Sequence, residues 1–258
     1  LAPAQPVRLP PAVVEAEPFP GTTLSLNSGV KLLFNQPMER LSVEGALKVE
    51  PAVGGRFEWQ DDSSVTFVPD QTLPAGSDLK VTIGETARAA NGIALQEAIV
   101  FEYTTAEPLR ATQRLPEGNA VDPFAAVVVA FNQPVVALGA ETQDLPVALT
   151  LEPTTKGRGE WLNTSTYIFY PEPALAGGVT YTARINPDLI SVAGSRLAED
   201  SAMPWQFTTT IPAFLRLSTQ TELSLPLEEV FEMPFNQPMY RVKTEAAISL
   251  TDANGKVV

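Results

Sequence analysis

One five-residue pattern occurs three times in this chain of 258 residues, and it divides the chain into similar units. The copies begin at Phe34, Phe131 and Phe235, so they lie 97 and then 104 residues apart. Regular self-similarity is the signature of a chain assembled from repeated structural units. The copies read Phe34-Asn35-Gln36-Pro37-Met38, Phe131-Asn132-Gln133-Pro134-Val135 and Phe235-Asn236-Gln237-Pro238-Met239.

A longer match connects the first two units. Residues 47–83 align without a gap on residues 149–185, at an offset of 102. The alignment predicts two complete modules, over residues 12–106 and 107–211. The identical pairs include Glu50/Glu152, Pro51/Pro153, Gly55/Gly157, Arg56/Arg158, Trp59/Trp161, Phe67/Phe169, Pro69/Pro171 and Gly76/Gly178.

The third copy of the pattern predicts the start of a further module over residues 212–258. Ile248 follows Phe235 by 13 residues, as Leu47 follows Phe34, but the sequence holds no third counterpart of Trp59. We therefore expect an incomplete module and a fragment of a longer protein. Residues 1–11 contain four prolines, which favour extended and solvated backbone, and we predict that they form a linker.

The residues before each copy of the pattern place apolar side chains at every second position. Such alternation indicates a strand with one face buried in a core. A proline then removes a backbone donor shortly after each strand. The alternate positions hold Val30, Leu32 and Phe34 in the first unit, Val127, Val129 and Phe131 in the second, and Phe231, Met233 and Phe235 in the third.

Turn signals separate several more runs of this kind, and helix signals are sparse. Gly76 and Gly178 are expected in turns with positive φ, and Asn91-Gly92 is a strong turn signal. Short strands in units of about 100 residues predict an all-β chain of tandem immunoglobulin-like β-sandwich modules. We expect the indole rings of Trp59 and Trp161 to lie inward, as anchors of the two cores.

The composition excludes several classes of function. The chain has neither cysteine nor histidine, so it cannot form a disulfide, a thiolate metal site or a catalytic triad with histidine. Its formal net charge of −13 disfavours binding to the phosphates of nucleic acids. No run of about 20 apolar residues, the length of a membrane-spanning helix, is present. We expect no cofactor, no nucleic-acid partner and no membrane span.

The candidate groups for chemistry are carboxylates that are adjacent in sequence, Asp61-Asp62 and Glu199-Asp200. Neighbouring side chains on a strand point to opposite faces, so neither pair suits the paired action of a glycosidase. Acidic loops in β-modules also bind calcium, but the second module has no acidic residues in place of Asp61-Asp62. We predict no catalytic residue and no metal site, and a chain that is not an enzyme by itself.

The repeated pattern has two interpretations, a binding loop or a requirement of the fold. Because it recurs in three modules whose surface residues differ, the requirement of the fold is the simpler interpretation. The asparagines are then expected to satisfy backbone groups of a turn. The proposed structural motif comprises Phe34, Asn35, Pro37, Trp59, Phe67, Phe131, Asn132, Pro134, Trp161, Phe169, Phe235, Asn236 and Pro238.

Taken together, the F-N-Q-P-[MV] strand end, the G-R-x-E-W strand and the closing F-x-[YF]-T-T strand resemble bacterial Ig-like domains of the SbsA type. In the second unit, the residues from Gly157 to Tyr167, followed by those from Leu175 to Tyr181, are similar to N-terminal modules of bacterial α2-macroglobulin-family proteins. Members of that family trap proteases: cleavage of a bait segment closes a shell, and in many members a Cys–Gln thioester couples to the attacker. The resemblance implies that the bait region and thioester lie outside this chain.

Two functions follow from the repeat and its resemblances. The first is a non-catalytic scaffold or spacer in the N-terminal region of a bacterial α2-macroglobulin-like protease inhibitor, whose partners are the remainder of the parent chain and, through the parent, target proteases. The alternative is a structural or adhesive module of a cell-surface or S-layer protein. Either function predicts an extracytoplasmic location, in the periplasm, at the cell surface or secreted. Such a location is compatible with a lipid anchor on an N-terminus removed from this sequence.

Overall fold

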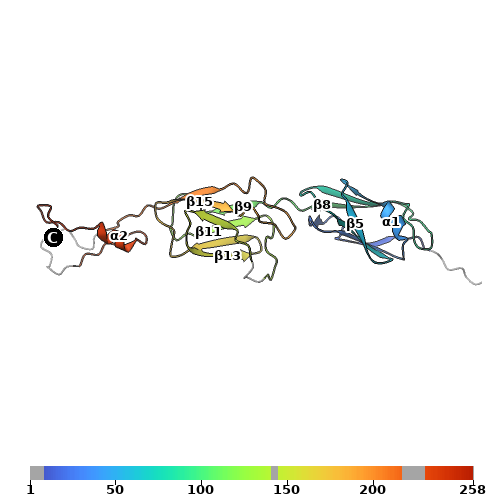
Figure 1. Cartoon of the computed structure of the whole chain (residues 1–258), viewed down its shortest axis with the longest axis horizontal. Coiled ribbons are helices and arrows are strands. Elements are labelled where there is room, and N and C mark those ends of the chain that lie inside the picture. The colour runs from blue at the N-terminus through green and yellow to red at the C-terminus, as the bar shows by residue number, and fades with distance from the viewer. Residues whose placement is uncertain (1–8, 141–144, 217–229, 258) are drawn as a thin grey trace, which may run out of the picture. The chain divides into compact units, whose positions relative to one another are not determined.

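The computed structural model describes residues 9–140, 145–216 and 230–257, which form two compact units (Figure 1). Residues 1–8 of the predicted linker over residues 1–11 lie outside the described residues, as does part of the third module. The first unit is drawn from Leu1–Arg110, Phe131–Ala140 and Pro187–Glu199, and the second from Ala111–Ala130, Glu141–Asn186 and Asp200–Val258.

Leu109 connects the separate segments of the first unit. Its side chain is fully buried, and its backbone N–H donates to the carbonyl oxygen of Arg196 over 3.0 Å. Its own carbonyl oxygen accepts the N–H of Ala198 at 2.8 Å. Segment Pro187–Glu199 is therefore part of the first unit through backbone pairing as well as packing.

The first sandwich consists of two four-stranded sheets, with the strand orders β1-β3-β6-β5 and β2-β8-β7-β4. Neighbouring strands are antiparallel, except β2 and β8, which are parallel. The elements are β1 (Val13–Glu17), β2 (Thr23–Leu24), β3 (Val30–Phe34), α1 (Arg40–Ala46), β4 (Leu47–Glu50), β5 (Gly55–Asp61), β6 (Ser64–Pro69), β7 (Asp78–Ile83) and β8 (Ile99–Thr105).

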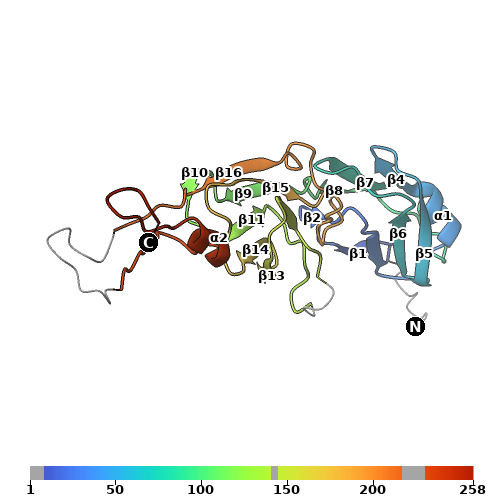
Figure 2. The ribbon, with the colours of Figure 1, turned by 60° about the vertical axis from the view of Figure 1, so that its left-hand side comes forward.

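The second sandwich repeats this strand order, with the sheets β9-β11-β14-β13 and β10-β16-β15-β12 (Figure 2). Here β10 and β16 form the parallel pair. The strands are β9 (Ala111–Leu115), β10 (Gly118–Val121), β11 (Val127–Phe131), β12 (Leu149–Glu152), β13 (Gly157–Asn163), β14 (Thr166–Pro171), β15 (Thr180–Ile185) and β16 (Trp205–Thr209). The predicted third module, residues 212–258, contains α2 (Arg241–Ala246).

The two sandwiches share their register as well as their strand order. Val30 lies opposite Phe67 in the first, and Val127 lies opposite Phe169 in the second. The pairing of β5 with β6 shifts between Trp59 and Asp61, and that of β13 with β14 shifts between Trp161 and Asn163. The repeat in the sequence is therefore a repeat of strand pairing.

The faces with predicted period-two alternation are the buried faces. Val30, Leu32 and Phe34 are at most 3% exposed, and their counterparts on β11 are at most 5% exposed. The residues between them, Lys31 and Leu33, are half-buried. Two complete sandwiches made of such strands confirm the prediction of an all-β chain with tandem β-sandwich modules.

Helix α1 was not expected from the sparse helix signals. It buries Val43 and Ala46 against the first core. The predicted third module has α2 at the equivalent place, since Arg241 follows Phe235 by the same number of residues as Arg40 follows Phe34.

Gly55 and Gly157 begin the edge strands β5 and β13, where an aromatic ring lies directly against the backbone. A Cβ added at Gly55 would lie 2.4 Å from the ring of Phe67. At Gly157 it would lie 2.3 Å from the carbonyl oxygen of Tyr170 and 2.5 Å from the ring of Phe169. These contacts explain why both modules have glycine here, since no other residue permits so close an approach.

We predict that Gly55→Ala and Gly157→Ala each destabilise the chain by about 1–3 kcal/mol, because the added methyl group forces the ring or the strand to move. The control is Gly45→Ala in α1, where a Cβ meets nothing within 4 Å. That change is expected to be neutral or to stabilise by up to about 1 kcal/mol, because alanine favours helix. Urea unfolding followed by circular dichroism measures all three, and wild-type stability in Gly55→Ala would contradict the packing described.

Candidate functional site

The asparagine of the repeated pattern binds the segment that leads into its module. Asn35 follows β3, and its Oδ1 accepts a hydrogen bond from the N–H of Ala12 (3.0 Å) while its Nδ2 donates to the carbonyl oxygen of Pro10 (3.2 Å). The backbone N–H of Asn35 donates to the carbonyl oxygen of Ala12 at 3.0 Å. We call these three hydrogen bonds the asparagine clamp.

The asparagine clamp is present in all three copies of the pattern. Its side-chain bonds measure 2.8 and 3.1 Å in the second copy and 2.8 and 3.1 Å in the third. An amide supplies one acceptor and one donor at once, which neither a carboxylate nor a hydrocarbon of similar shape can do. The partners are Arg110 and Pro108 for Asn132, and Ala213 and Ile211 for Asn236.

The glutamine that follows adds a fourth bond in the first two copies. Gln36 Nε2 donates to the carbonyl oxygen of Leu9 (3.0 Å), and Gln133 Nε2 donates to that of Glu107 (2.6 Å). Gln237 differs, since it is 8% exposed and lies where a Cβ on Gly177 would come within 2.1 Å of its Nε2. The first two glutamines therefore also bind a backbone carbonyl group. In each case it belongs to the residue just before the proline that the asparagine binds.

The prolines of the pattern anchor a different part of each module. The carbonyl oxygen of Pro37 accepts the N–H of Ala90 at 2.9 Å, and that of Pro134 accepts the N–H of Val192 at 2.8 Å. The third copy, Pro238, is exposed. Proline at this position ends the strand and still offers its carbonyl group to a distant loop.

The aromatic residues of the proposed motif lie in the cores or beside them. Phe34, Phe131 and Phe67 are buried, and Phe169 is half-buried. Phe235 is half-buried, and its ring meets that of Phe214 edge-on, with centroids 6.1 Å apart. These positions give packing contacts and leave no polar group for a ligand.

Trp59 and Trp161 lie at the margins of their modules and not at the centres of the cores, although Trp59 packs against the first core as predicted. Both are half-buried. Trp59 Nε1 donates to Glu44 Oε1 (2.9 Å), and the guanidinium of Arg40 lies 5.4 Å above its ring. Trp161 Nε1 donates to the carbonyl oxygen of Pro146 (2.8 Å). Their place on the edge strands β5 and β13 explains the exposure, because an edge strand has a neighbour on one side only.

Two buried threonines stabilise the fold through hydrogen bonds to backbone groups, and they were not predicted from the sequence. Thr105 and Thr209 end the closing strands and are each 1% exposed. The Thr105 hydroxyl donates to the carbonyl oxygen of Pro74 (2.6 Å) and accepts the N–H of Ser77 (2.8 Å). Thr209 makes the same pair of bonds, with Ala176 and Val179. Their recurrence in the closing T-T dipeptide is the signal that was available.

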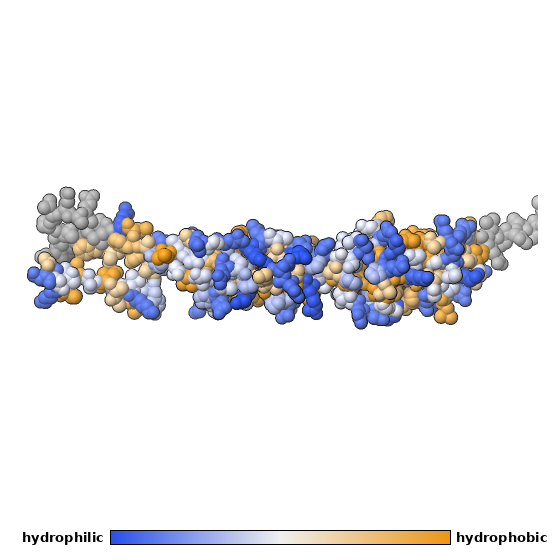
Figure 3. All heavy atoms as spheres, turned by 90° about the horizontal axis from the view of Figure 1, so that it is seen from above, coloured by the Kyte–Doolittle hydropathy of each residue, from blue (hydrophilic) through white to orange (hydrophobic). Residues whose placement is uncertain are grey.

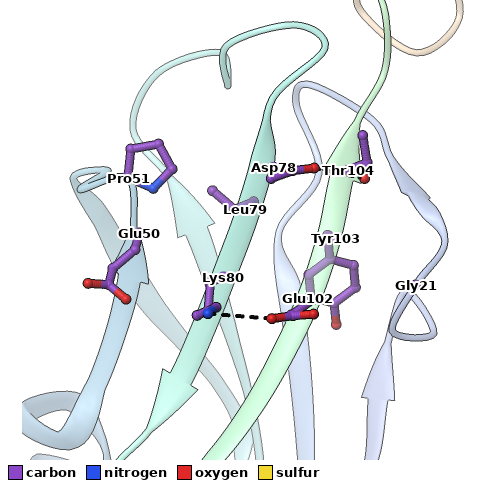
Figure 4. Close-up of a pocket in the computed structure, with 9 residues that line it drawn as sticks. All are labelled: Gly21, Glu50, Pro51, Asp78, Leu79, Lys80, Glu102, Tyr103 and Thr104. Carbon is purple, nitrogen blue, oxygen red and sulfur yellow. Dashed lines mark hydrogen bonds and ion pairs between the residues drawn. The ribbon is translucent and has the colours of Figure 1, made fainter.

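A hollow of about 580 Å³ lies on the sheet face formed by β4, β7 and β8 (Figure 4). Lys80 Nζ lies 3.4 Å from Glu102 Oε1 across it. Tyr103 reaches toward Pro18 and donates to its carbonyl oxygen at 3.0 Å, and burial raises the pKa of the Tyr103 phenol. The phenol is thus a neutral donor that is already engaged, and not an acid poised for proton transfer.

The second module has the same cross-strand contacts with different chemistry. Gln206 Nε2 donates to Thr182 Oγ1 (3.1 Å) at the positions of Glu102 and Lys80. Since a neutral pair serves where the first module has an ion pair, the contact is a support between strands. The hollow therefore carries no repeated chemistry.

The carboxylates singled out in the sequence are used locally. Asp61 Oδ1 accepts the N–H of Ser63 at 2.7 Å, and Asn163 Oδ1 accepts that of Ser165 at 2.9 Å, so both residues close the same turn. Asp62 Oδ1 accepts two bonds from Arg40, at 3.0 and 2.8 Å. The pair Glu199-Asp200 lies in a turn before β16.

Neither a metal-binding cluster nor a membrane-spanning helix occurs in the part of the chain that the structure describes. Among those residues, no three or more carboxylates come together in a group that could hold a metal ion. Over the same residues, none of the helices has the length and apolar character needed to cross a membrane.

We predict that Asn132→Ala lowers the free energy of unfolding by about 1 kcal/mol, because two backbone groups lose their partners. The matched control is Asn119→Ala in the same module, since Asn119 is exposed and its side chain makes no hydrogen bond among the described residues. Urea unfolding monitored by tryptophan fluorescence compares the two. Equal stability of both variants would mean that the two side-chain bonds of the asparagine clamp contribute nothing to the fold.

Comparisons with known proteins agree with this architecture. The family described as bacterial Ig-like domain matches residues 7–105 and again residues 106–209. A curated relative, the probable L,D-transpeptidase 3 of Mycobacterium tuberculosis, is 33% identical over 79 residues, which are 28% of this chain and 29% of that protein. The chain thus spans less than a third of the length of this relative.

Two solved structures illustrate similarity at lower identity. An L,D-transpeptidase from Mycobacterium smegmatis has 18% identity and a TM-score of 0.32, over 58% of this chain and 59% of that one. The bacterial S-layer protein SbsC has 14% identity and a TM-score of 0.31, over 97% of this chain and 31% of that one. The family matches, in contrast, cover most of the chain and coincide with its two sandwiches, so this chain belongs to the family of bacterial Ig-like domains.

Proposed function

We propose that this chain is a non-catalytic scaffold or spacer in the N-terminal region of an extracytoplasmic bacterial protease inhibitor of the α2-macroglobulin type. The observation that carries the proposal is that the recurring polar residues are used by the fold itself. The asparagine clamp and the threonines Thr105 and Thr209 all bind backbone within their own units. Because these side chains bind backbone groups, they support a structural role for the chain.

The residues that resemble α2-macroglobulin-type modules also make contacts within the second sandwich. Arg158 pairs with Glu160 on β13, and the ring of Trp161 meets that of Tyr167 edge-on, with centroids 5.4 Å apart. The hydroxyl of Tyr181 accepts the N–H of Ala176 at 2.9 Å. The similar residues thus have structural roles in the module. In the proposal, the chemistry that traps a protease belongs to other parts of the parent protein.

The hydrophilic surface of the two sandwiches is consistent with a spacer that is exposed to solvent. Figure 3 shows hydrophilic residues over much of the visible face of both sandwiches. Ion pairs of the first sandwich join exposed side chains, as in Lys31 with Glu17 at 3.2 Å and Arg40 with Asp62 at 2.8 Å. Such pairs contribute little to stability but keep the surface well solvated.

A second candidate function has its own observation. The relative with 33% local identity is named a probable L,D-transpeptidase, and this identity covers only 79 residues. Ig-like modules of this type would then be spacers for a different parent, either an enzyme or a structural or adhesive protein of the cell surface. In each case the chain itself holds other parts in place and performs no catalysis.

The first candidate predicts that the intact parent protein traps trypsin. On native gels the parent should shift in mobility after exposure to trypsin, and the trapped protease should still cleave a small chromogenic substrate. A covalent adduct on denaturing gels that methylamine pretreatment abolishes would add the thioester. The 258-residue chain alone is the control and should neither shift nor retain protease.

Progressive digestion of the parent, without a mobility shift and without retained trypsin activity, would exclude the inhibitor. The second candidate would then be tested on the same preparation, by binding to isolated cell walls. Retention of trypsin by the chain alone would contradict the spacer role in either case.

A further inference from the structure

Residues 187–199 follow β15 in the chain, yet they belong to the first unit, and we call them the docking loop. The carbonyl oxygen of Ala193, at the tip of this loop, accepts the N–H of Leu26 at 2.8 Å. The side chain of Ala193 packs against the first core. Leu26 lies between β2 and β3 and is only 3% exposed. The docking loop therefore covers part of the first core.

Gly194 brings the backbone of the docking loop close to the first sandwich. A Cβ at Gly194 would lie 2.8 Å from Asn27 Nδ2 and 3.5 Å from the Cβ of Leu26. The equivalent turn of the first module has Gly92, where a Cβ would meet nothing within 4 Å. Both glycines have positive φ, +85° and +84°. Because the two turns share this conformation, the close approach at Gly194 is not a requirement of the turn itself.

On the side of the sandwich, the two modules differ at the position that donates to the loop. The carbonyl oxygen of Leu26 accepts the N–H of Leu73 at 2.8 Å. The carbonyl oxygen of Pro123 accepts the N–H of Leu175 at the same distance, so Leu26 and Pro123 hold equivalent places. Proline has no N–H, so this place in the second sandwich cannot donate a hydrogen bond to a docked turn.

On the side of the loop, the residue before the glycine also differs. Ala193 corresponds to Asn91 in the first module, at the offset of 102. Asn91 is exposed, and its Nδ2 donates to Gln36 Oε1 at 3.1 Å. Alanine is small and apolar, which suits packing against a core. The two members of the contact, Leu26 and Ala193, thus each have a property that their counterparts lack.

We propose that Leu26 and Asn27 form a docking surface whose partner is the docking loop of this same chain, and that the local stability of the first sandwich depends on this contact. The surface fits a tight turn with a small apolar residue, an unpaired carbonyl oxygen and a glycine. Leu109 holds the base of the loop by two backbone hydrogen bonds. The inference concerns contacts within the first unit, so it holds for any parent protein.

The first test introduces Ala193→Asp in the full chain. The change places a charge against the first core and should release the tip of the docking loop. Hydrogen exchange measured by mass spectrometry should then accelerate by at least about tenfold in peptides covering residues 23–30, which belong to the first sandwich. Val192→Asp is the matched control, because it adds the same charge one residue earlier, on a side chain that is 57% exposed. It should leave exchange in residues 23–30 as in the wild type.

A second pair of variants, Gly194→Asn and Gly92→Asn, guards against a turn that fails to form. Asparagine tolerates positive φ, so both turns should persist. Only Gly194→Asn places a side chain against Asn27, so it alone should accelerate exchange in residues 23–30. Wild-type exchange there in both Ala193→Asp and Gly194→Asn would overturn the proposal, as would equal effects of the two glycine variants.

The dependence should also be visible from the opposite side, because coupling between two sites is reciprocal. Leu26→Pro removes the donor and introduces the residue that the second module has at this place. Exchange in residues 187–199 should rise. The double variant with Ala193→Asp should show no further increase, since both changes break one contact. Additive increases would mean that each change acts alone and would overturn the proposal.

Discussion

The asparagine clamp determines where each module begins. β1 is an edge strand with β3 as its single neighbour, so its register depends on how the preceding residue is fixed. Asn35 holds that residue, Ala12, through both the N–H and the carbonyl oxygen, and Val13 then pairs with Phe34. Each such bond is worth about 1 kcal/mol net, yet together they choose one register among the shifts that a strand permits.

Equivalent positions of the two modules differ in charge, although they make the same kind of contact. Asp61 and Asn163 differ in charge, yet both close a turn with one acceptor oxygen at the same position. Lys80 and Glu102 give way to Thr182 and Gln206, and the contact between strands remains. What both modules keep is the hydrogen bond or the volume that the sandwich requires, which is the behaviour expected of a scaffold.

Much of the fold was predictable because short-range patterns determine it. The alternation of apolar residues on β3 and β11 identified their buried faces, and Gly76 and Gly178 have the positive φ that their turns suggested, at 63° and 69°. Features that depend on distant partners were not predictable in the same way. The asparagines were expected to satisfy turn groups, but Asn35 binds residues 23 and 25 positions earlier in the chain. The half-burial of Trp59 follows from its edge strand, and a single sequence does not reveal which strands lie at an edge.

Amide hydrogen exchange in the wild-type chain, measured residue by residue with NMR spectroscopy, tests the central role of the asparagine clamp most directly. The N–H groups of Ala12 and Arg110 precede β1 and β9, and each donates to an asparagine side chain. Both should exchange only when their module opens, at rates close to those of the neighbouring strands. Exchange at the rate of an unstructured peptide, while β3 and β11 stay protected, would show that the incoming segments are not held and would contradict the role assigned to the clamp.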